Sequence, residues 1–173
     1  MYRILLVDDE PNILNALRRC LASIDVGELD GEALKVEAFT SPEQALERSE
    51  EQDFDLVISD YRMPNMDGVQ FLSAMIELQP AAPRMICSGY ADRDVIIAAV
   101  NEVQLARFIG KPWVDEDLAS AVVTLLQPGG ARARAQRQAG AQKSARIQAV
   151  PARVTHVEHD DEGAIVLRSD DPV

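Results

Sequence analysis

The sequence predicts an α/β domain built around a parallel β-sheet, and two features of residues 1–127 support this prediction. Short apolar runs alternate with segments in which apolar residues recur at helical spacing, which is the pattern of consecutive β/α units. Most of the apolar runs are continuous, as expected for strands that are covered on both faces. Because crossovers between parallel strands are right-handed, we expect helices on both faces of the sheet.

The first two units follow this pattern. A strand is expected at residues 4–7, and the helix after it has Pro11 at a favourable first position. The second strand, at residues 34–38, alternates apolar with charged residues and is therefore expected at a half-exposed edge of the sheet. Ser41 and Pro42 then supply the N-cap and the first-turn proline of the second helix.

Three further units complete the domain. Their strands are expected at residues 56–58, 84–87 and 107–109. Gly68 opens the third helix, apolar residues between positions 95 and 103 predict the fourth, and residues 115–127 predict the fifth. The domain is therefore expected to contain five strands and five helices in strict alternation.

Composition restricts the class of protein. A hydrophobic fraction of 47% and a charged fraction of 27% over 173 residues fit a soluble globular domain with a tail. The apolar runs are too short to span a membrane, and the N-terminus has the pattern of a strand rather than a signal peptide. Cys20 and Cys87 predict neither a disulfide framework nor a zinc site, so we expect a cytoplasmic protein.

The charge is unevenly distributed along the chain. The net charge of −12 argues against nonspecific nucleic-acid binding by the whole protein, yet residues 128–173 carry 7 basic and 6 acidic side chains. We expect a domain at residues 1–127, a basic linker rich in Ala, Gln and Arg at 128–153, and an acidic tail at 154–173 that is a candidate for a β-hairpin.

The tail offers two further interpretations, and both are less favoured. The basic linker has the charge to contact nucleic acid or an acidic membrane surface, but it has no aromatic residues for stacking on bases. His156 and His159 resemble part of a metal motif but lack the His-Glu-x-x-His order, and solvated hairpin residues explain them better.

Polar residues follow the predicted strands at the points where these strands end. Asp8 and Asp9 follow the first strand, Asp60 the third, Ser88 the fourth and Lys111 the fifth. Ligands of open α/β sheets bind beyond these carboxyl ends, so we expect the five side chains to converge. Clustered carboxylates repel one another unless a cation neutralises them, and oxygen ligands suit Mg²⁺.

This cluster has the groups that phosphoryl transfer requires. Asp60 is a candidate nucleophile, because a carboxylate can attack phosphorus and form an aspartyl phosphate. Lys111 would pair with the incoming phosphate, and the Ser88 hydroxyl would donate a hydrogen bond to it. The reaction then depends mainly on positioning and on neutralisation of charge.

Four motifs carry a resemblance to a known family. They are Val7-Asp8-Asp9-Glu10, Ser59-Asp60-Tyr61-Arg62-Met63-Pro64-Asn65-Met66-Asp67-Gly68, Cys87-Ser88-Gly89 and Gly110-Lys111-Pro112-Trp113. Together they resemble the receiver domain of bacterial response regulators, over residues 1–127 and in the family's order. The resemblance implies a flavodoxin-like, doubly wound sheet with strand order 2-1-3-4-5. That order places the second strand at an edge, in agreement with its alternating pattern.

The resemblance also implies roles at the metal and phosphorylation site. Asp60 is implied as the phosphoacceptor that becomes 4-aspartylphosphate. Asp9 and Asp60 are implied as Mg²⁺ ligands through their carboxylates, Asp8 through a water molecule and Arg62 through its backbone carbonyl. Lys111 is implied as the partner of the phosphate.

Switching and timing are implied for other residues. Ser88 resembles the switch hydroxyl, although threonine is commoner there, and Phe108 resembles the aromatic residue that turns inward on activation. Arg62 and Tyr90 lie two positions after Asp60 and Ser88, where side chains flank the approach of water. Both are bulky, so we expect slow self-dephosphorylation.

The sequence-based hypothesis is a single-domain response regulator of a two-component phosphorelay. It would accept a phosphoryl group from a histidine kinase or phosphotransfer protein and would not be an enzyme with a separate substrate. One alternative is a phosphorylation-independent adaptor, which the complete set of acidic and basic residues disfavours. Another is an aspartyl-phosphate hydrolase, but that class resembles Asp-x-Asp after the first strand, whereas Asp8 and Asp9 are adjacent.

The output of such a regulator is not evident from the motifs. The sequence around Asp60 and Lys111 resembles receivers attached to HD-GYP cyclic-dinucleotide phosphodiesterases or to hybrid kinases, but neither such a module nor a DNA-binding helix-turn-helix is expected here. We therefore expect output through contact with a downstream protein, or a homodimer, formed by the fourth helix, the fifth strand and the fifth helix.

Overall fold

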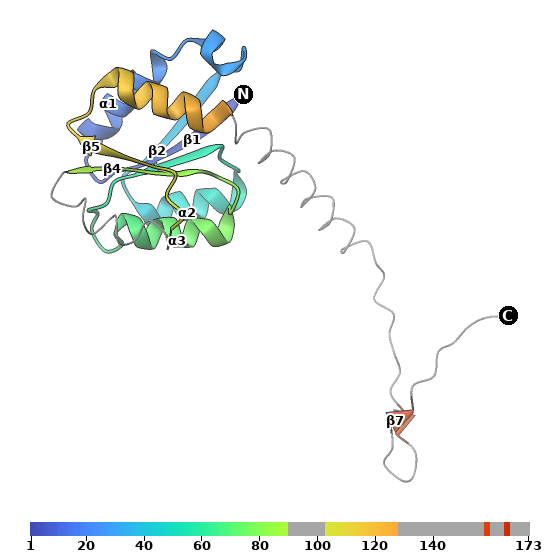
Figure 1. The fold of residues 1–173 in the computed structure, drawn as a ribbon. Coiled ribbons are helices and arrows are strands. Elements are labelled where there is room, and N and C mark those ends of the chain that lie inside the picture. Colours follow the sequence, from blue (N-terminus) through green and yellow to red (C-terminus); the bar gives the residue numbers. More distant parts are fainter. Residues whose placement is uncertain (90–102, 128–157, 160–164, 167–173) are drawn as a thin grey trace. The chain divides into compact units, whose positions relative to one another are not determined.

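The computed structural model describes residues 1–89 and 103–127, together with two short strands at residues 158–159 and 165–166. Five parallel strands form one sheet in the order β2-β1-β3-β4-β5 (Figure 1). These strands are β1 (Tyr2–Val7), β2 (Leu34–Phe39), β3 (Leu56–Ser59), β4 (Arg84–Gly89) and β5 (Arg107–Lys111). The predicted parallel sheet and its strand order are confirmed, with β2 at one edge.

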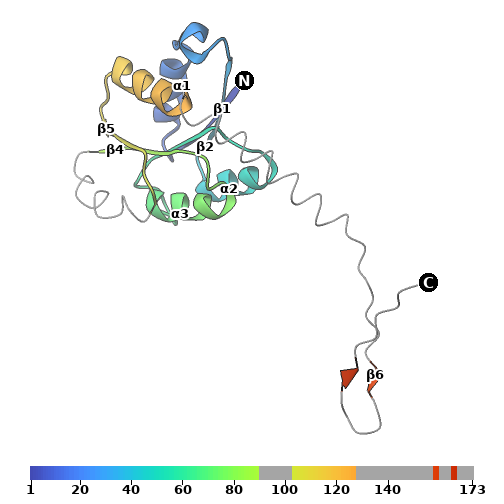
Figure 2. The same ribbon diagram turned by 45° about the vertical axis from the view of Figure 1, so that its right-hand side comes forward.

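Helices cover both faces of this sheet. The helices are α1 (Pro11–Ala22), α2 (Pro42–Glu51), α3 (Gly68–Leu78) and a further helix at residues 115–127, which we call the C-terminal helix of the domain. Figure 1 shows α1 and this helix on one face and α2 and α3 on the other, and the turned view in Figure 2 shows the same three layers. The predicted fourth helix lies outside the described residues, apart from Val103, which is buried.

Two hydrophobic clusters correspond to the two faces. Leu6 and Ile58 point toward α1 and the C-terminal helix, whereas Leu5 and Val57 point toward α2 and α3. Successive side chains of a strand point to opposite faces, and here both faces are covered by helices, so β1 and β3 are apolar without interruption. The continuous apolar runs of the sequence are therefore explained by this double cover.

Local sequence determines where the helices start. Pro11 occupies the first position of α1, and the Ser41 hydroxyl accepts a hydrogen bond from the Gln44 amide as the predicted N-cap of α2. At α3, Asp67 and Gln70 form a reciprocal capping box, which fixes the point where the chain leaves the sheet edge and turns into a helix.

The strand ends differ from those predicted. The fourth and fifth strands continue to Gly89 and Lys111, because Ser88 pairs with Gly110 and Gly89 pairs with Lys111. Ser88 and Lys111 therefore lie among the last residues of β4 and β5, whereas they were predicted to follow these strands. Backbone pairing continues beyond the apolar run, so a prediction from hydrophobicity alone ends these strands too early.

The polar stretch between α1 and β2 contains a short helical turn. The stretch at residues 25–32 contains a 3-10 helix, η1 (Val26–Leu29), and Leu29 is 1% exposed. Asp30 has a φ of 54°, in the left-handed region that an aspartate tolerates better than most residues. Leu29 thus anchors to the core a segment whose composition is that of a loop.

The chain divides into two compact units, Met1–Arg137 and Gln138–Val173. Within the second unit, β6 (Glu158–His159) and β7 (Ile165–Val166) pair in antiparallel fashion. The predicted boundaries at residues 127 and 153 stay predictions. Over the part of the chain that the structure describes, none of the helices combines the length and the apolar character needed to cross a membrane.

Candidate functional site

Asp8, Asp60 and Lys111 meet at the carboxyl edge of the sheet. Asp8 directly follows β1, Asp60 directly follows β3, and Lys111 is the last residue of β5. The Lys111 ammonium lies 2.7 Å from Asp8 Oδ2 and 2.7 Å from Asp60 Oδ1, and donates a hydrogen bond to each. The two carboxylates are deeply buried, with the Asp8 side chain 2% exposed and the Asp60 side chain 7%. One cation thus bridges two acids that the topology brings together.

Backbone amides hold both carboxylates in place. The Arg62 amide donates to Asp60 Oδ2 over 2.7 Å, and the Glu10 amide donates to Asp8 Oδ1 over 2.9 Å. Each carboxylate therefore accepts one backbone bond and one bond from Lys111. An ionised carboxylate has about four acceptor positions, so each retains capacity for another ligand.

Burial and charge act in opposite directions at this cluster. Burial raises the pKa of Asp8 above its ordinary value, and the hydrogen bond from Lys111 offsets this only in part. Burial by itself would lower the pKa of Lys111, but the hydrogen bonds with Asp60 and Asp8 outweigh it and the pKa is raised. The lysine is thus firmly protonated, and two buried acids share a single positive charge.

The other predicted site residues lie at or near the same edge. Asp9 follows Asp8 and is half-buried, and the Arg62 side chain is exposed while its amide binds Asp60. Ser88 is 2% exposed, opposite Gly110 in the sheet. Direct hydrogen bonds between side chains join Asp8, Asp60 and Lys111; the positions of the others are compatible with their predicted roles, which stay predictions.

Phe108 was predicted to act in switching, and Tyr90 was predicted to affect the lifetime of the phosphoryl group. Phe108 is half-buried in β5, where it pairs with Ile86 and packs against the cluster on the α2 and α3 face. Tyr90 lies outside the described residues. The proposed switch and lifetime roles therefore stay predictions for both.

The donor chemistry of the edge fits a hard divalent cation. The carboxylates of Asp8 and Asp60 retain acceptor capacity, Asp9 adds a third acid at the same strand end, and all are the oxygen ligands that Mg²⁺ prefers. Within residues 1–89 and 103–127, however, no three His, Cys, Asp or Glu side chains gather closely enough to form a metal centre. Lys111 bridges the two buried acids instead.

Cys87 lies near the site, and its place in the motif Cys87-Ser88-Gly89 predicted no role for it. It lies in β4 and is 1% exposed, and burial raises the pKa of its thiol to about 12. A thiol with such a pKa stays protonated at neutral pH and is a poor nucleophile. Cys87 therefore contributes packing beneath the acidic edge.

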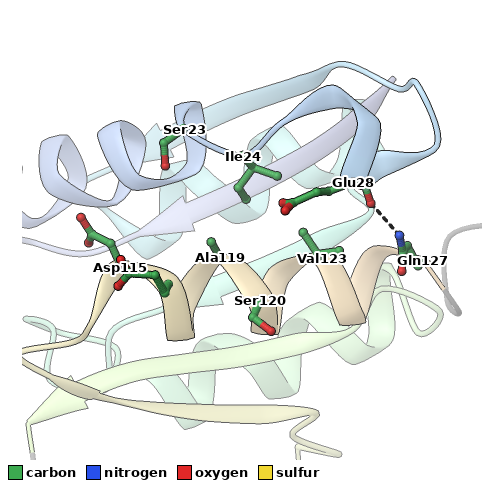
Figure 3. Close-up of a pocket in the computed structure, with 9 residues that line it drawn as sticks. Ser23, Ile24, Glu28, Asp115, Ala119, Ser120, Val123 and Gln127 are labelled. Atoms are coloured by element: carbon green, nitrogen blue, oxygen red, sulfur yellow. Dashed lines mark hydrogen bonds between the residues drawn. The ribbon is translucent and has the colours of Figure 1, made fainter.

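A groove between η1, the end of α1 and the C-terminal helix is separate from this edge (Figure 3). It encloses about 500 Å³, and at one end the Gln127 side-chain amide donates to the Glu28 carbonyl over 2.6 Å. Its lining residues are Ser23, Ile24, Glu28, Asp115, Glu116, Ala119, Ser120, Val123 and Gln127. Three carboxylates and no basic side chain line it, so it is unsuited to a phosphate group.

Comparison with known proteins agrees with this fold. The model of the response regulator receiver domain matches residues 4–123. The chain therefore belongs to the response regulator receiver domain family, and its flavodoxin-like sheet is that of a receiver.

Individual proteins and solved structures are similar to this chain over most of its length. The hydrogenase transcriptional regulatory protein HoxA of Cupriavidus necator is 35% identical over 127 residues, which is 73% of this chain and 24% of the relative. A crystal structure of an uncharacterized protein from Neptuniibacter caesariensis is 41% identical, with a TM-score of 0.66 over 76% of this chain and 91% of that one. The signal receiver domain of an HD domain-containing protein from Pseudomonas fluorescens Pf-5 is 29% identical, also with a TM-score of 0.66, over 75% and 98%.

The chain spans about a quarter of the length of the first curated relatives that it matches. The shared region is the receiver domain, so what these relatives regulate is a property of longer proteins.

Proposed function

We propose that this chain is a phosphoacceptor in two-component signalling and that Asp60 accepts the phosphoryl group. The observation that carries the proposal is the contact of a buried aspartate with a lysine ammonium at the carboxyl edge of the sheet, 2.7 Å from Oδ1. Asp60 has the nucleophilic oxygen, and Lys111 has the charge that a phosphate needs. The donor would be a phosphohistidine of a kinase or phosphotransfer protein, or a small molecule such as acetyl phosphate.

The transfer step forms one bond and breaks one. An Asp60 carboxylate oxygen attacks phosphorus, and the bond between phosphorus and the donor atom breaks with its electron pair leaving on the donor. The leaving group is acetate when acetyl phosphate is the donor. When a phosphohistidine is the donor, the leaving group is the histidine imidazole, whose nitrogen takes up a proton from water. The product is an aspartyl phosphate, which is a mixed anhydride and therefore labile in base.

Residues of the chain position this reaction. The Arg62 amide holds Asp60 Oδ2, which leaves the other oxygen directed toward Lys111. Once the carboxylate is phosphorylated, the Lys111 ammonium can pair with a phosphoryl oxygen in place of Oδ1. Ser88, buried at the end of β4, is proposed to donate a hydrogen bond from its hydroxyl to a phosphoryl oxygen, with Phe108 following as the switch aromatic.

A magnesium ion belongs to this proposal. Asp9 and Asp60 would hold it through carboxylates, Asp8 through water and Arg62 through its carbonyl. When bound, it supplies positive charge that offsets the acidic edge and the phosphoryl oxygens.

The proposal also includes a cytoplasmic location, because Cys20 and Cys87 are free thiols.

We propose output through protein contact, with a downstream target or a second copy binding the face that contains β5 and the C-terminal helix. The chain itself would not be an enzyme with a separate substrate.

Intact-mass measurement tests the phosphoacceptor proposal. With acetyl phosphate and Mg²⁺, the wild type should gain the mass of one phosphoryl group, and EDTA should prevent the gain. Asp60→Asn should gain nothing, whereas Asp55→Asn should behave as the wild type. Asp55 is a matched control because it is a buried aspartate at the opposite end of β3, where its carboxylate accepts from the Arg3 amide. Labelling of Asp60→Asn at the wild-type level would refute the proposal.

A further inference from the structure

The backbone of Asp60 is held by hydrogen bonds on several sides. Its amide donates to the Val7 carbonyl over 2.8 Å, which ties it to the end of β1. Its carbonyl oxygen accepts from the Ser59 hydroxyl over 2.7 Å. One residue on, the Tyr61 carbonyl accepts from the Gly68 amide over 2.8 Å. Hydrogen bonds therefore hold the carbonyl of the Asp60–Tyr61 peptide and the backbone on either side of this peptide.

The Ser59 hydroxyl is fully enclosed. Ser59 is 0% exposed at the end of β3, between Val7 on one neighbouring strand and Ile86 on the other. A buried hydroxyl must find a partner, and the partner here is the carbonyl oxygen of the next residue. Removal of this hydroxyl would leave that buried carbonyl without the bond that fixes its direction.

Gly68 packs directly against the same carbonyl. A Cβ atom added at Gly68 would lie 2.1 Å from the Asp60 carbonyl oxygen and 2.9 Å from Tyr61 Cα. Both obstacles are backbone atoms, so the clash cannot be relieved by a change of rotamer. Gly68 is also the first residue of α3, which the Asp67 capping box holds in place. The start of α3 therefore presses on the peptide of the candidate phosphoacceptor and tolerates no side chain there.

We propose that Ser59 and Gly68 are positioning residues for the reacting carboxylate of Asp60. Neither touches the incoming phosphoryl group; they act through the Asp60 carbonyl, Ser59 by a hydrogen bond and Gly68 by close packing. Together they set the direction in which the Asp60 side chain extends from the backbone, and hence the distance between its carboxylate and the Lys111 ammonium. This inference rests on the proposed function, because it assigns these residues to the same reaction.

The geometry sets the size of the expected effect. An ordinary contact between carbon and oxygen is longer than 3 Å, so a methyl group at Gly68 must move the Asp60 peptide or α3 by about 1 Å. Misplacement of a reacting group by about 1 Å can slow a reaction by about a hundredfold. The loss of one hydrogen bond at Ser59 is milder, and we expect a slowing of about tenfold, which corresponds to about 1.4 kcal/mol.

The test compares two pairs of variants in the full chain. Ser59→Ala is paired with Ser49→Ala, because Ser49 is also buried and its hydroxyl also donates to a backbone carbonyl over 2.7 Å, but within α2. Gly68→Ala is paired with Gly27→Ala, where the added Cβ meets only the movable Asp25 carboxylate. Phosphorylation is followed by mass at increasing acetyl phosphate concentration and saturating Mg²⁺, and the melting temperature of each variant is recorded.

A positioning role predicts a lower maximal rate at Ser59→Ala and Gly68→Ala, with little change in the half-saturating donor concentration. Both control variants should retain the wild-type maximal rate, whatever their melting temperatures. Wild-type maximal rates in folded Ser59→Ala and Gly68→Ala would overturn the inference, and Ser59→Ala alone decides if Gly68→Ala does not fold. Failure of the wild type to be phosphorylated at Asp60 would instead refute the proposed function, so the two failures are distinguishable.

Discussion

Replacement of Lys111 by methionine should destabilise the domain, because the lysine is the cation that bridges Asp8 and Asp60. Methionine keeps most of the side-chain volume but removes both 2.7 Å hydrogen bonds. A hydrogen bond to a charged group contributes about 1.5–3 kcal/mol, and two such bonds would give about 3–6 kcal/mol. The variant no longer has to desolvate an ammonium, which offsets part of this loss.

We therefore expect Lys111→Met to lower the free energy of unfolding by about 2–4 kcal/mol at neutral pH. The Lys111 side chain is 17% exposed, so little of this effect is lost to screening by solvent. The measurement is urea unfolding in EDTA, which keeps divalent cations from replacing the missing charge. The same variant should lose phosphorylation from acetyl phosphate when Mg²⁺ is supplied.

Lys35→Met is the matched control for this experiment. Lys35 also contacts a carboxylate, Glu37 at 3.3 Å, but its side chain is 47% exposed. Exposed ion pairs contribute about 0–1 kcal/mol, so this variant should be close to the wild type. Equal losses of stability in Lys111→Met and Lys35→Met would refute the reasoning that the bridge between the two buried acids is energetically special.

Three other predictions concern different parts of the chain. The hydrogen bond from Arg48 lowers the pKa of Glu37, so the contribution of Glu37 to stability is present at neutral pH and is lost as the pH falls below the ordinary glutamate pKa. Glu37→Gln should therefore make the free energy of unfolding, measured in urea, depend less on pH in this range, and an unchanged pH dependence would contradict this. Arg84→Met should lower the free energy of unfolding by about 2 kcal/mol, because the buried guanidinium donates to the carbonyls at residues 82 and 103; wild-type stability would contradict this. The double variant Arg62→Asn, Tyr90→Ala should lose its phosphoryl group faster than the wild type in a time course of intact mass, and equal lifetimes would exclude the proposed timing role.

The sheet could be predicted from the sequence because its signals are local. Residues 4–7 and 56–58 are continuous apolar runs, and the alternation at 34–38 identified the edge strand. The strand ends were harder to predict, because Ser88 and Lys111 have polar side chains but continue the backbone pairing. Sequence patterns reflect the polarity of side chains, whereas strand pairing depends on the backbone of a neighbouring strand.

The candidate site could be assembled in outline for the same topological reason. Asp8, Asp60 and Lys111 stand at strand ends, and parallel strands bring these ends to one edge. The direct bridge by Lys111 could not be foreseen, because it depends on side-chain distances. Ser59 and Gly68 were visible in the motif, but their contact with the Asp60 carbonyl is a matter of close packing that no spacing rule contains.

The most direct test of the central claim is to locate the phosphoryl group within the chain. Borohydride reduction of the protein treated with donor and Mg²⁺ converts an aspartyl phosphate to homoserine, which peptide mass spectrometry can assign to one position. We expect homoserine at residue 60 and at neither Asp8 nor Asp9. Homoserine at Asp8 or Asp9, or a labelled protein with an intact Asp60, would contradict it.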